Sequence, residues 1–224
     1  MIKLQRGQSM VEFNLALPFM VPLVLLGVML VVQWGFIFIT KSTLDAATVQ
    51  AVRTGALHHG GMPQMQESLA HAMRPLYSRN TTATDAASSL ARSMADTALL
   101  SQIRVLNPNT EVFDAFKHRV IYDGAQVFEI PNNNLMYRSP QLKSLGDGRA
   151  MNLQDANLLH IEVRWCARLI VPIANHIMRG ILTTFQLNPS PEQLACNAIG
   201  QADGNVYLAV VSEATMRMQT PFRM

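Results

Sequence analysis

Residues 3–40 read KLQRGQSMVEFNLALPFMVPLVLLGVMLVVQWGFIFIT, and this stretch decides how the chain begins to fold. No charged side chain occurs between residues 13 and 40. As a helix this run would be about 40 Å long, at about 1.5 Å per residue, whereas the hydrocarbon core of a bilayer is about 30 Å thick. The stretch therefore predicts a membrane-spanning helix. Trp34 and Phe36 lie near its far end, where aromatic side chains favour the interface.

The flanks of this run predict its orientation. Lys3 and Arg6 precede it without an acid, whereas Lys41 and Asp45 follow it and offset each other. Because positive flanks tend to stay in the cytoplasm, we expect a cytoplasmic N-terminus. The rest of the chain would then lie in a bacterial periplasm or an equivalent space. A cleaved signal peptide fits poorly, since its apolar region is roughly 7–15 residues long and ends at an Ala-x-Ala-like site; an uncleaved signal anchor remains open.

A single acid, Glu12, stands at the start of the apolar run. On insertion scales a carboxylate costs roughly 2.5–3.5 kcal/mol at mid-membrane and less near the interface. Glu12 could therefore be an interfacial side chain that reaches the headgroups. It could also have a partner: a cut after Gly7 would give Gln8 a free α-amino group and make Glu12 the fifth residue. An ion pair between Glu12 and that amine of a neighbouring subunit would fix register.

The stretch RGQSMVEF resembles the class III signal of type IV pilins and pseudopilins, and it is similar to the opening of TadE-like proteins. These are minor pseudopilins of the tight-adherence (Tad, or Flp, type IVb) pilus system. IPNNNLMYRSP (130–140) and NLQDANLLHIEVRWCARLIVPI (152–173) resemble the C-terminal pattern of longer TadE-like proteins. The departure is Gln8, because many type IV pilins have phenylalanine first after the cut.

This resemblance implies a subunit that acts in pilus biogenesis and adhesion and is cut after Gly7 by a prepilin peptidase. Its partners would be that peptidase, the inner membrane, and other pilins and pseudopilins through the N-terminal helix. The alternative is a periplasmic scaffold or binding protein held by an uncleaved anchor. The expected segments are a leader peptide (1–7), a transmembrane and amphipathic helix (8–57), a helical segment (58–100) and a periplasmic β-rich domain (101–224).

The fold class expected from the patterns is α+β. A helical period continues to about Leu57, and HHGGMP at 58–63 should end it, since two glycines and a proline break helices. A helix is expected at 63–78, and another, capped by Thr84, should run to about residue 100. The apolar positions expected to face inward on these three helices are Leu44, Ala47, Ala51, Val52, Leu69, Met73, Leu76, Ala87, Leu90, Ala91, Met94 and Ala98.

Beyond residue 100 the period changes to that of strands. A strand is expected at 102–107, a hairpin around Asp123-Gly124, an alternating strand at 158–171 and a last strand at 205–219. We expect these to form an antiparallel sheet packed on the long helix. The inward side chains of the alternating strand should be Leu159, Ile161, Val163 and Trp165. Residues 173–185 should form a short helix that packs on the domain or lies along the membrane, and packing is favoured.

Cys166 and Cys196 are the two cysteines of the chain. In a cytosolic protein they would be buried thiols, but in an exported domain a disulfide is expected.

No catalytic, metal or cofactor-binding residues are expected. His58 and His59 are adjacent and lack a Cys/His cluster with zinc spacing, and no phosphate loop or Gly-x-Ser-x-Gly motif occurs. Asp155 and Asn157 are expected to cap the turn before a strand. The net charge is only +3, without a block of cations, which argues against nucleic-acid binding. We therefore expect a structural protein and not an enzyme.

Overall fold

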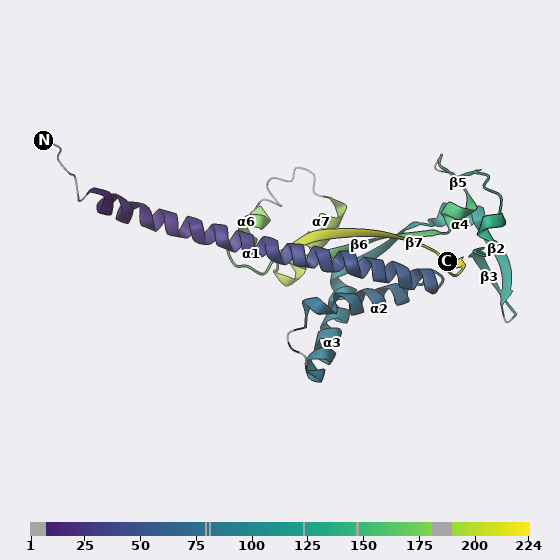
Figure 1. Cartoon of the computed structure of the whole chain (residues 1–224), viewed down its shortest axis with the longest axis horizontal. Helices are drawn as coiled ribbons and strands as arrows, with labels where there is room; N and C mark the ends of the chain where they lie inside the picture. Colours follow the sequence, from purple (N-terminus) through teal and green to yellow (C-terminus); the bar gives the residue numbers. More distant parts are fainter. Residues whose placement is uncertain (1–7, 79, 81, 123, 147, 181–189) are drawn as a thin grey trace. The chain divides into compact units, whose positions relative to one another are not determined.

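The computed structural model describes residues 8–78, 80, 82–122, 124–146, 148–180 and 190–224 (Figure 1). They divide into two compact units. The N-terminal unit contains Met1–Ile39, of which the first seven residues lie outside the described part, and Arg168–Leu208. The sheet unit contains Thr40–Ala167 and Ala209–Met224. A long apolar helix, further helices and antiparallel sheets confirm the α+β class.

Helix α1 (Gln8–Leu57) is continuous through Pro18 and Pro22 and ends where the sequence predicts. The break follows from backbone conformation, because His59 (φ 58°) and Gly60 (φ 79°) are both left-handed. The Gly60 amide donates to the Gly55 carbonyl at 2.8 Å and closes the helix end. Gly60 is required twice over, since its φ favours glycine and a Cβ there would collide with the Phe222 ring.

Helix α2 (Met62–Met73) continues as the 3-10 turn η1 (Arg74–Leu76), and helix α3 (Ala83–Leu100) follows. The inward residues expected on α2 are confirmed, because Leu69 and Met73 are fully buried and Leu76 packs against the core. The expected cap of α3 is wrong by two residues. The Thr82 hydroxyl accepts from the Asp85 amide at 3.3 Å, so Thr84 lies inside the first turn.

The expected inward face of α3 is also wrong. Ala87, Ala91, Met94 and Ala98 are exposed and Leu90 is half-buried. The buried side chains of this helix are Ser89, Ser93 and Thr97. Small residues let α3 approach α2 closely, and the Ser93 hydroxyl donates to the Ala70 carbonyl at 2.5 Å. A hydroxyl that is satisfied in this way can be buried at little cost.

The larger sheet has the order β1-β6-β7, with β1 at Ser101–Asn107, β6 at Leu158–Arg168 and β7 at Tyr207–Arg217. β1 pairs antiparallel with β6. The alternation predicted for β6 is confirmed, because Leu159, Ile161 and Val163 are fully buried and Trp165 is 3% exposed. These side chains share one core cluster with the predicted α1 residues Leu44, Ala47, Ala51 and Val52. The sheet therefore packs on the C-terminal part of α1.

Polar contacts strengthen this packing. Lys41 Nζ donates to Asp45 Oδ1 at 2.6 Å and to the Val211 carbonyl at 2.8 Å. The Ser212 hydroxyl donates to the same Asp45 oxygen at 2.6 Å. Strand β7 is thus tied to α1 through one carboxylate and one ammonium group. Lys41 and Asp45, which the sequence showed only as two charges that offset each other, therefore hold β7 against α1.

The hairpin is confirmed, but the expectation that it joins the same sheet is wrong, because it forms a second sheet of order β2-β3-β8. Gly124 has φ 81° in its turn, whereas Asp123 lies outside the described residues. The sheet contains β2 (His118–Tyr122), β3 (Ala125–Ile130) and β8 (Phe222–Arg223), and a third sheet contains β4 (Lys143–Ser144) and β5 (Ala150–Met151). Shorter helical elements of this unit are α4 (Thr110–Phe116), η2 (Leu135–Tyr137) and α5 (Leu153–Ala156).

The N-terminal unit also contains α6 (Ala174–Gly180) and α7 (Pro191–Asp203). α6 confirms the short helix predicted at 173–185 as far as residue 180, and residues 181–185 lie outside the described part of the chain. α7 was not predicted, although its signals are present. The Ser190 hydroxyl accepts from the Gln193 amide at 3.2 Å, and Pro191 occupies the first turn.

Candidate functional site

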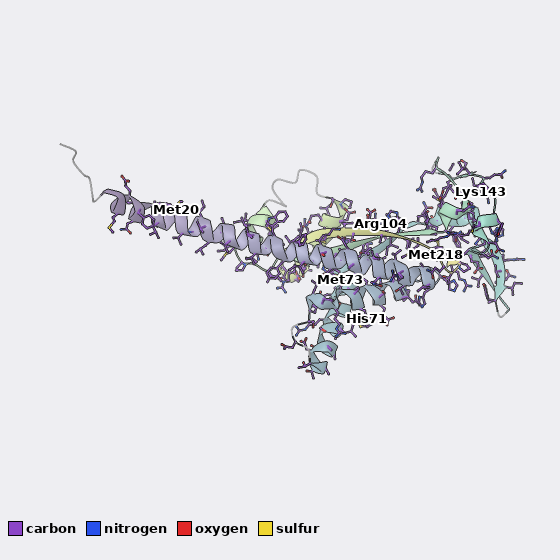
Figure 2. The ribbon with its side chains drawn as sticks, viewed as in Figure 1. Met20, His71, Met73, Arg104, Lys143 and Met218 are labelled. Carbon is purple, nitrogen blue, oxygen red and sulfur yellow. The ribbon has the colours of Figure 1, made fainter. Side chains whose placement is uncertain are left out.

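The first half of α1 exposes its apolar side chains. It is long and apolar enough to cross a membrane, and none of its most apolar part is buried. Met20, labelled in Figure 2, is 58% exposed, and Phe13 and Phe19 are 67% and 77% exposed. Each such side chain gains roughly 1.5–3 kcal/mol when it leaves water. This surface therefore requires lipid or other apolar helices around it.

Glu12 lies on this surface and is exposed. It is the only charged residue between Arg6 and Lys41. Gly7 lies outside the described residues, and Gln8 is the first residue of α1. Residues four apart on a helix share a face and are about 6 Å apart along the axis. A free amine at Gln8 would thus lie one turn from the Glu12 carboxylate. The cut and the ion pair remain predictions.

Gln33 interrupts the apolar stretch between Asn14 and Thr40, and it is fully buried. Its Oε1 accepts a hydrogen bond from the Val171 amide at 2.9 Å. Its Nε2 is buried and has no hydrogen-bond partner among the described residues. Leu26, Met29 and Leu30, which precede it by seven, four and three residues, share its helix face and are half-buried. This face of α1 is therefore covered, and Gln33 fixes where the 168–173 segment meets it.

The segment around Val171 is held by its backbone and presents two apolar side chains. Leu169 is 3% exposed and its amide donates to the Val206 carbonyl at 2.9 Å. Ile170 is 64% exposed and Ile173 is 54% exposed. Ile173 has φ 67°, a left-handed conformation that is rare and strained for a β-branched residue. Sequence reasoning missed this arrangement, although Gln33 was visible as a polar interruption of the apolar run.

Cys166 and Cys196 are disulfide-bonded, as the sequence predicts for an exported domain. Cys196 lies in α7 and Cys166 in β6.

Two polar side chains outside α1, Asp203 and Asn157, have structural partners. Asp203 accepts from the Tyr207 hydroxyl at 2.5 Å and from Asn205, whose side-chain and backbone N–H groups each lie 2.9 Å away. These hydrogen bonds, that of Tyr207 most of all, lower the pKa of Asp203 to about 2. An acid held ionised in this way is unsuited to proton transfer near neutral pH.

Asn157, which the sequence offered as a cap, is fully buried and holds separate segments together. Its side-chain Nδ2 donates to the backbone carbonyls of Pro131 and Leu153, and its backbone carbonyl accepts from the Met218 amide. Asn157 is the C-cap residue of α5, directly before β6, as expected, whereas the N-cap is Asn152, whose side chain accepts from the Asp155 amide at 2.7 Å.

Among the described residues, no group of three or more His, Cys, Asp or Glu side chains could hold a metal ion.

Comparison with known proteins points to the same helix. The model of the TadE-like protein family matches residues 7–53, which are Gly7 and α1 as far as Arg53. No curated protein and no solved structure matches the chain. The TadE-like family comprises structural pilus components and is not an enzyme family. The match at residues 7–53 is consistent with a TadE-like protein of Tad pilus systems.

Proposed function

We propose that this chain is a minor pseudopilin, a structural and assembly subunit of a Tad (Flp, type IVb) pilus that acts in pilus biogenesis and adhesion. One observation carries the proposal. Within the segment that matches the TadE-like model, α1 is a single unbroken helix from Gln8 onward, and most apolar side chains of its first half are exposed. Such a helix can occupy the inner membrane and later exchange lipid for neighbouring helices, because both surroundings are apolar.

The precursor would be cut after Gly7 by a prepilin peptidase on the cytoplasmic side of the inner membrane. Glycine suits a cut site because it has no Cβ to obstruct the approach of the peptidase. The apolar run would remain in the product, and the rest of the chain would lie in the periplasm. Lys3 and Arg6, the cations that favour this orientation, would leave with residues 1–7.

Glu12 would then set the stagger between neighbouring subunits by pairing with the amine of Gln8 on another chain. In a dry helix bundle an unpaired carboxylate is strongly disfavoured, so the register that satisfies it is selected over the others. The exposure of Glu12 supports this role, since its carboxylate is accessible to a second chain.

The test compares Glu12→Gln with the wild type in a host that makes the remaining pilus proteins. Removing one partner from a buried ion pair costs about 3–5 kcal/mol, so co-purification with the other subunits should fall by on the order of 100-fold or more. Asn14→Ala is the control, because Asn14 is exposed on the same stretch of α1 and carries no charge. Normal assembly of Glu12→Gln would reject the register role.

A chain that is never cut would instead be a periplasmic scaffold or binding protein on an uncleaved anchor. Glu12→Gln would then leave all interactions unchanged, since the α-amine at Gln8 would not exist. Gly7→Ala distinguishes the two functions independently: it should block piliation if the chain is a pseudopilin and be harmless if the chain is an anchored scaffold.

A further inference from the structure

We propose that the loop Leu169–Ile173, flanked by Arg168 and Arg179, is a second membrane-contact surface that lies in the lipid headgroup region beside α1. The proposal requires only that α1 crosses the membrane. It does not depend on cleavage after Gly7 or on assembly into a pilus.

The depth of this loop follows from α1. Residues 13–32, between Glu12 and Gln33, span about 30 Å at about 1.5 Å per residue, which matches the hydrocarbon thickness. Glu12 and Gln33 therefore lie about one hydrocarbon thickness apart, so Gln33 lies at the second boundary when Glu12 lies at the first, and the exposed aromatic residues Trp34, Phe36 and Phe38 lie in the interface. Val171, whose amide binds Gln33 Oε1 at 2.9 Å, lies at the second boundary. Trp34, the next residue, is 65% exposed, as expected for an aromatic side chain at an interface.

The side chains of the loop suit that depth. Ile170 and Ile173 are 64% and 54% exposed, and Pro172 between them is also exposed. Leu169 is buried and its amide donates to the Val206 carbonyl at 2.9 Å, so the backbone is held in place where the loop begins. Ile173 keeps a strained φ of 67° while its side chain stays exposed. Strain of this kind is retained mainly at functional positions.

Charges flank the apolar residues on both sides. Arg168 precedes the loop and Arg179 lies near the end of α6, and both are exposed. Apolar residues bordered by cations are typical of segments that lie in the plane of an interface, because the cations attract anionic headgroups. The pairing of Ile170 and Ile173 with these arginines therefore favours lipid as the occupant.

Exposure alone would not argue for lipid, since soluble proteins also expose single apolar side chains. What argues for lipid is the hydrogen bond between Gln33 and Val171, because it fixes these particular side chains at the level where α1 leaves the hydrocarbon. A second copy of the chain is the competing occupant, and the experiment separates the two.

The test is photo-crosslinking in the intact full-length chain, reconstituted in vesicles of phosphatidylethanolamine and phosphatidylglycerol that carry a fluorescent phospholipid. p-Benzoylphenylalanine replaces Ile170 or Ile173. The positive control is the same replacement at Val24, which is 57% exposed on the membrane helix. The matched negative control is Leu194, which is 53% exposed on α7 of the same unit. Non-reducing mass mapping of the Cys166–Cys196 disulfide checks that each variant is folded.

We expect lipid adducts at Ile170 and Ile173 severalfold above those at Leu194 and close to those at Val24. Adducts no higher than at Leu194, or adducts to a second polypeptide in place of lipid, would overturn the proposal. Gln33→Leu tests the anchor, because it removes the acceptor for the Val171 amide but keeps the span apolar. It should lower the lipid adduct at Ile173 and leave that at Val24 unchanged; an undiminished adduct at Ile173 would refute the role of Gln33.

Discussion

Two substitutions of Asn157 test whether this residue is a structural cross-link. Its side chain is fully buried, and Nδ2 donates to the Pro131 carbonyl at 3.1 Å and to the Leu153 carbonyl at 2.9 Å. Asn157→Ala removes both hydrogen bonds and leaves two carbonyls without a donor. At about 1 kcal/mol for each bond, and with a small cavity added, the free energy of unfolding should fall by about 2–3 kcal/mol.

Asn157→Asp should lower the free energy of unfolding further at neutral pH, because it places a carboxylate oxygen against the same two carbonyls. The folded variant must then bind a proton. From an unfolded pKa of about 3.9, protonation at pH 7 costs about 4 kcal/mol. The neutral acid recovers only one of the two donated bonds, so the total loss should be about 5 kcal/mol.

The pH dependence distinguishes this reasoning from a general packing defect. The new acid has its pKa raised on folding, so the stability of the variant is greatest below pH 3.9. It then falls relative to wild type as the pH rises, by about 1.4 kcal/mol per pH unit, until the folded pKa is passed. For Asn157→Ala, the loss in the free energy of unfolding relative to wild type should be the same at every pH in this range.

The assay is urea unfolding of the full chain in detergent micelles between pH 4 and 7, followed by tryptophan fluorescence, to which the buried Trp165 contributes. Equal losses for the two variants at every pH would refute the reasoning. If Asn157→Asp unfolded at the same urea concentration as the wild type, the reasoning would fail outright, because the site would then accept a carboxylate without loss of stability.

Two further predictions concern local conformation and charge. Gly60→Ala should lower the free energy of unfolding by about 3 kcal/mol or more, because a left-handed alanine costs about 1–2 kcal/mol and the new Cβ meets the Phe222 ring. Gly124 also has a left-handed φ of 81° but open space around it, so Gly124→Ala should cost only the backbone strain of about 1–2 kcal/mol. Equal losses of stability for the two variants in thermal unfolding would contradict this. The pKa of Asp203 is lowered to about 2 by Tyr207 and its neighbours, so its stabilisation is complete above the unfolded pKa and is lost as pH falls through about 2. The margin in melting temperature of wild type over Asp203→Asn should therefore shrink from pH 5 to pH 2, and a constant margin would show that its charge adds nothing.

The predictions from sequence succeeded where one strong period controls the structure. The membrane run and the alternation of β6 follow from apolar side chains that must avoid water, and the break after Leu57 follows from the two glycines and the proline of residues 60–63. The register of Ser101 opposite Trp165 could not be predicted, because it depends on how distant segments pair.

The prediction failed at α3 because alanine is a weak indicator of burial. Its exposed alanines form an apparent apolar face, yet Ser89, Ser93 and Thr97 face α2. A hydroxyl on a helix can be buried when a neighbouring carbonyl accepts its proton, as the Ala70 carbonyl does for Ser93. Sequence period alone does not show which carbonyl is near. The role of Gln33 was missed for the same reason, since its partner is the backbone amide of Val171.

The mass of the mature N-terminus tests the proposed function most directly. The chain is expressed with and without a prepilin peptidase, and its terminal peptide is identified by mass spectrometry, with Gly7→Ala as the uncut control. We predict a product that begins at Gln8 only when the peptidase is present and Gly7 is intact. A chain that keeps residues 1–7 beside an active peptidase would contradict the proposal that Glu12 pairs with an amine created by cleavage.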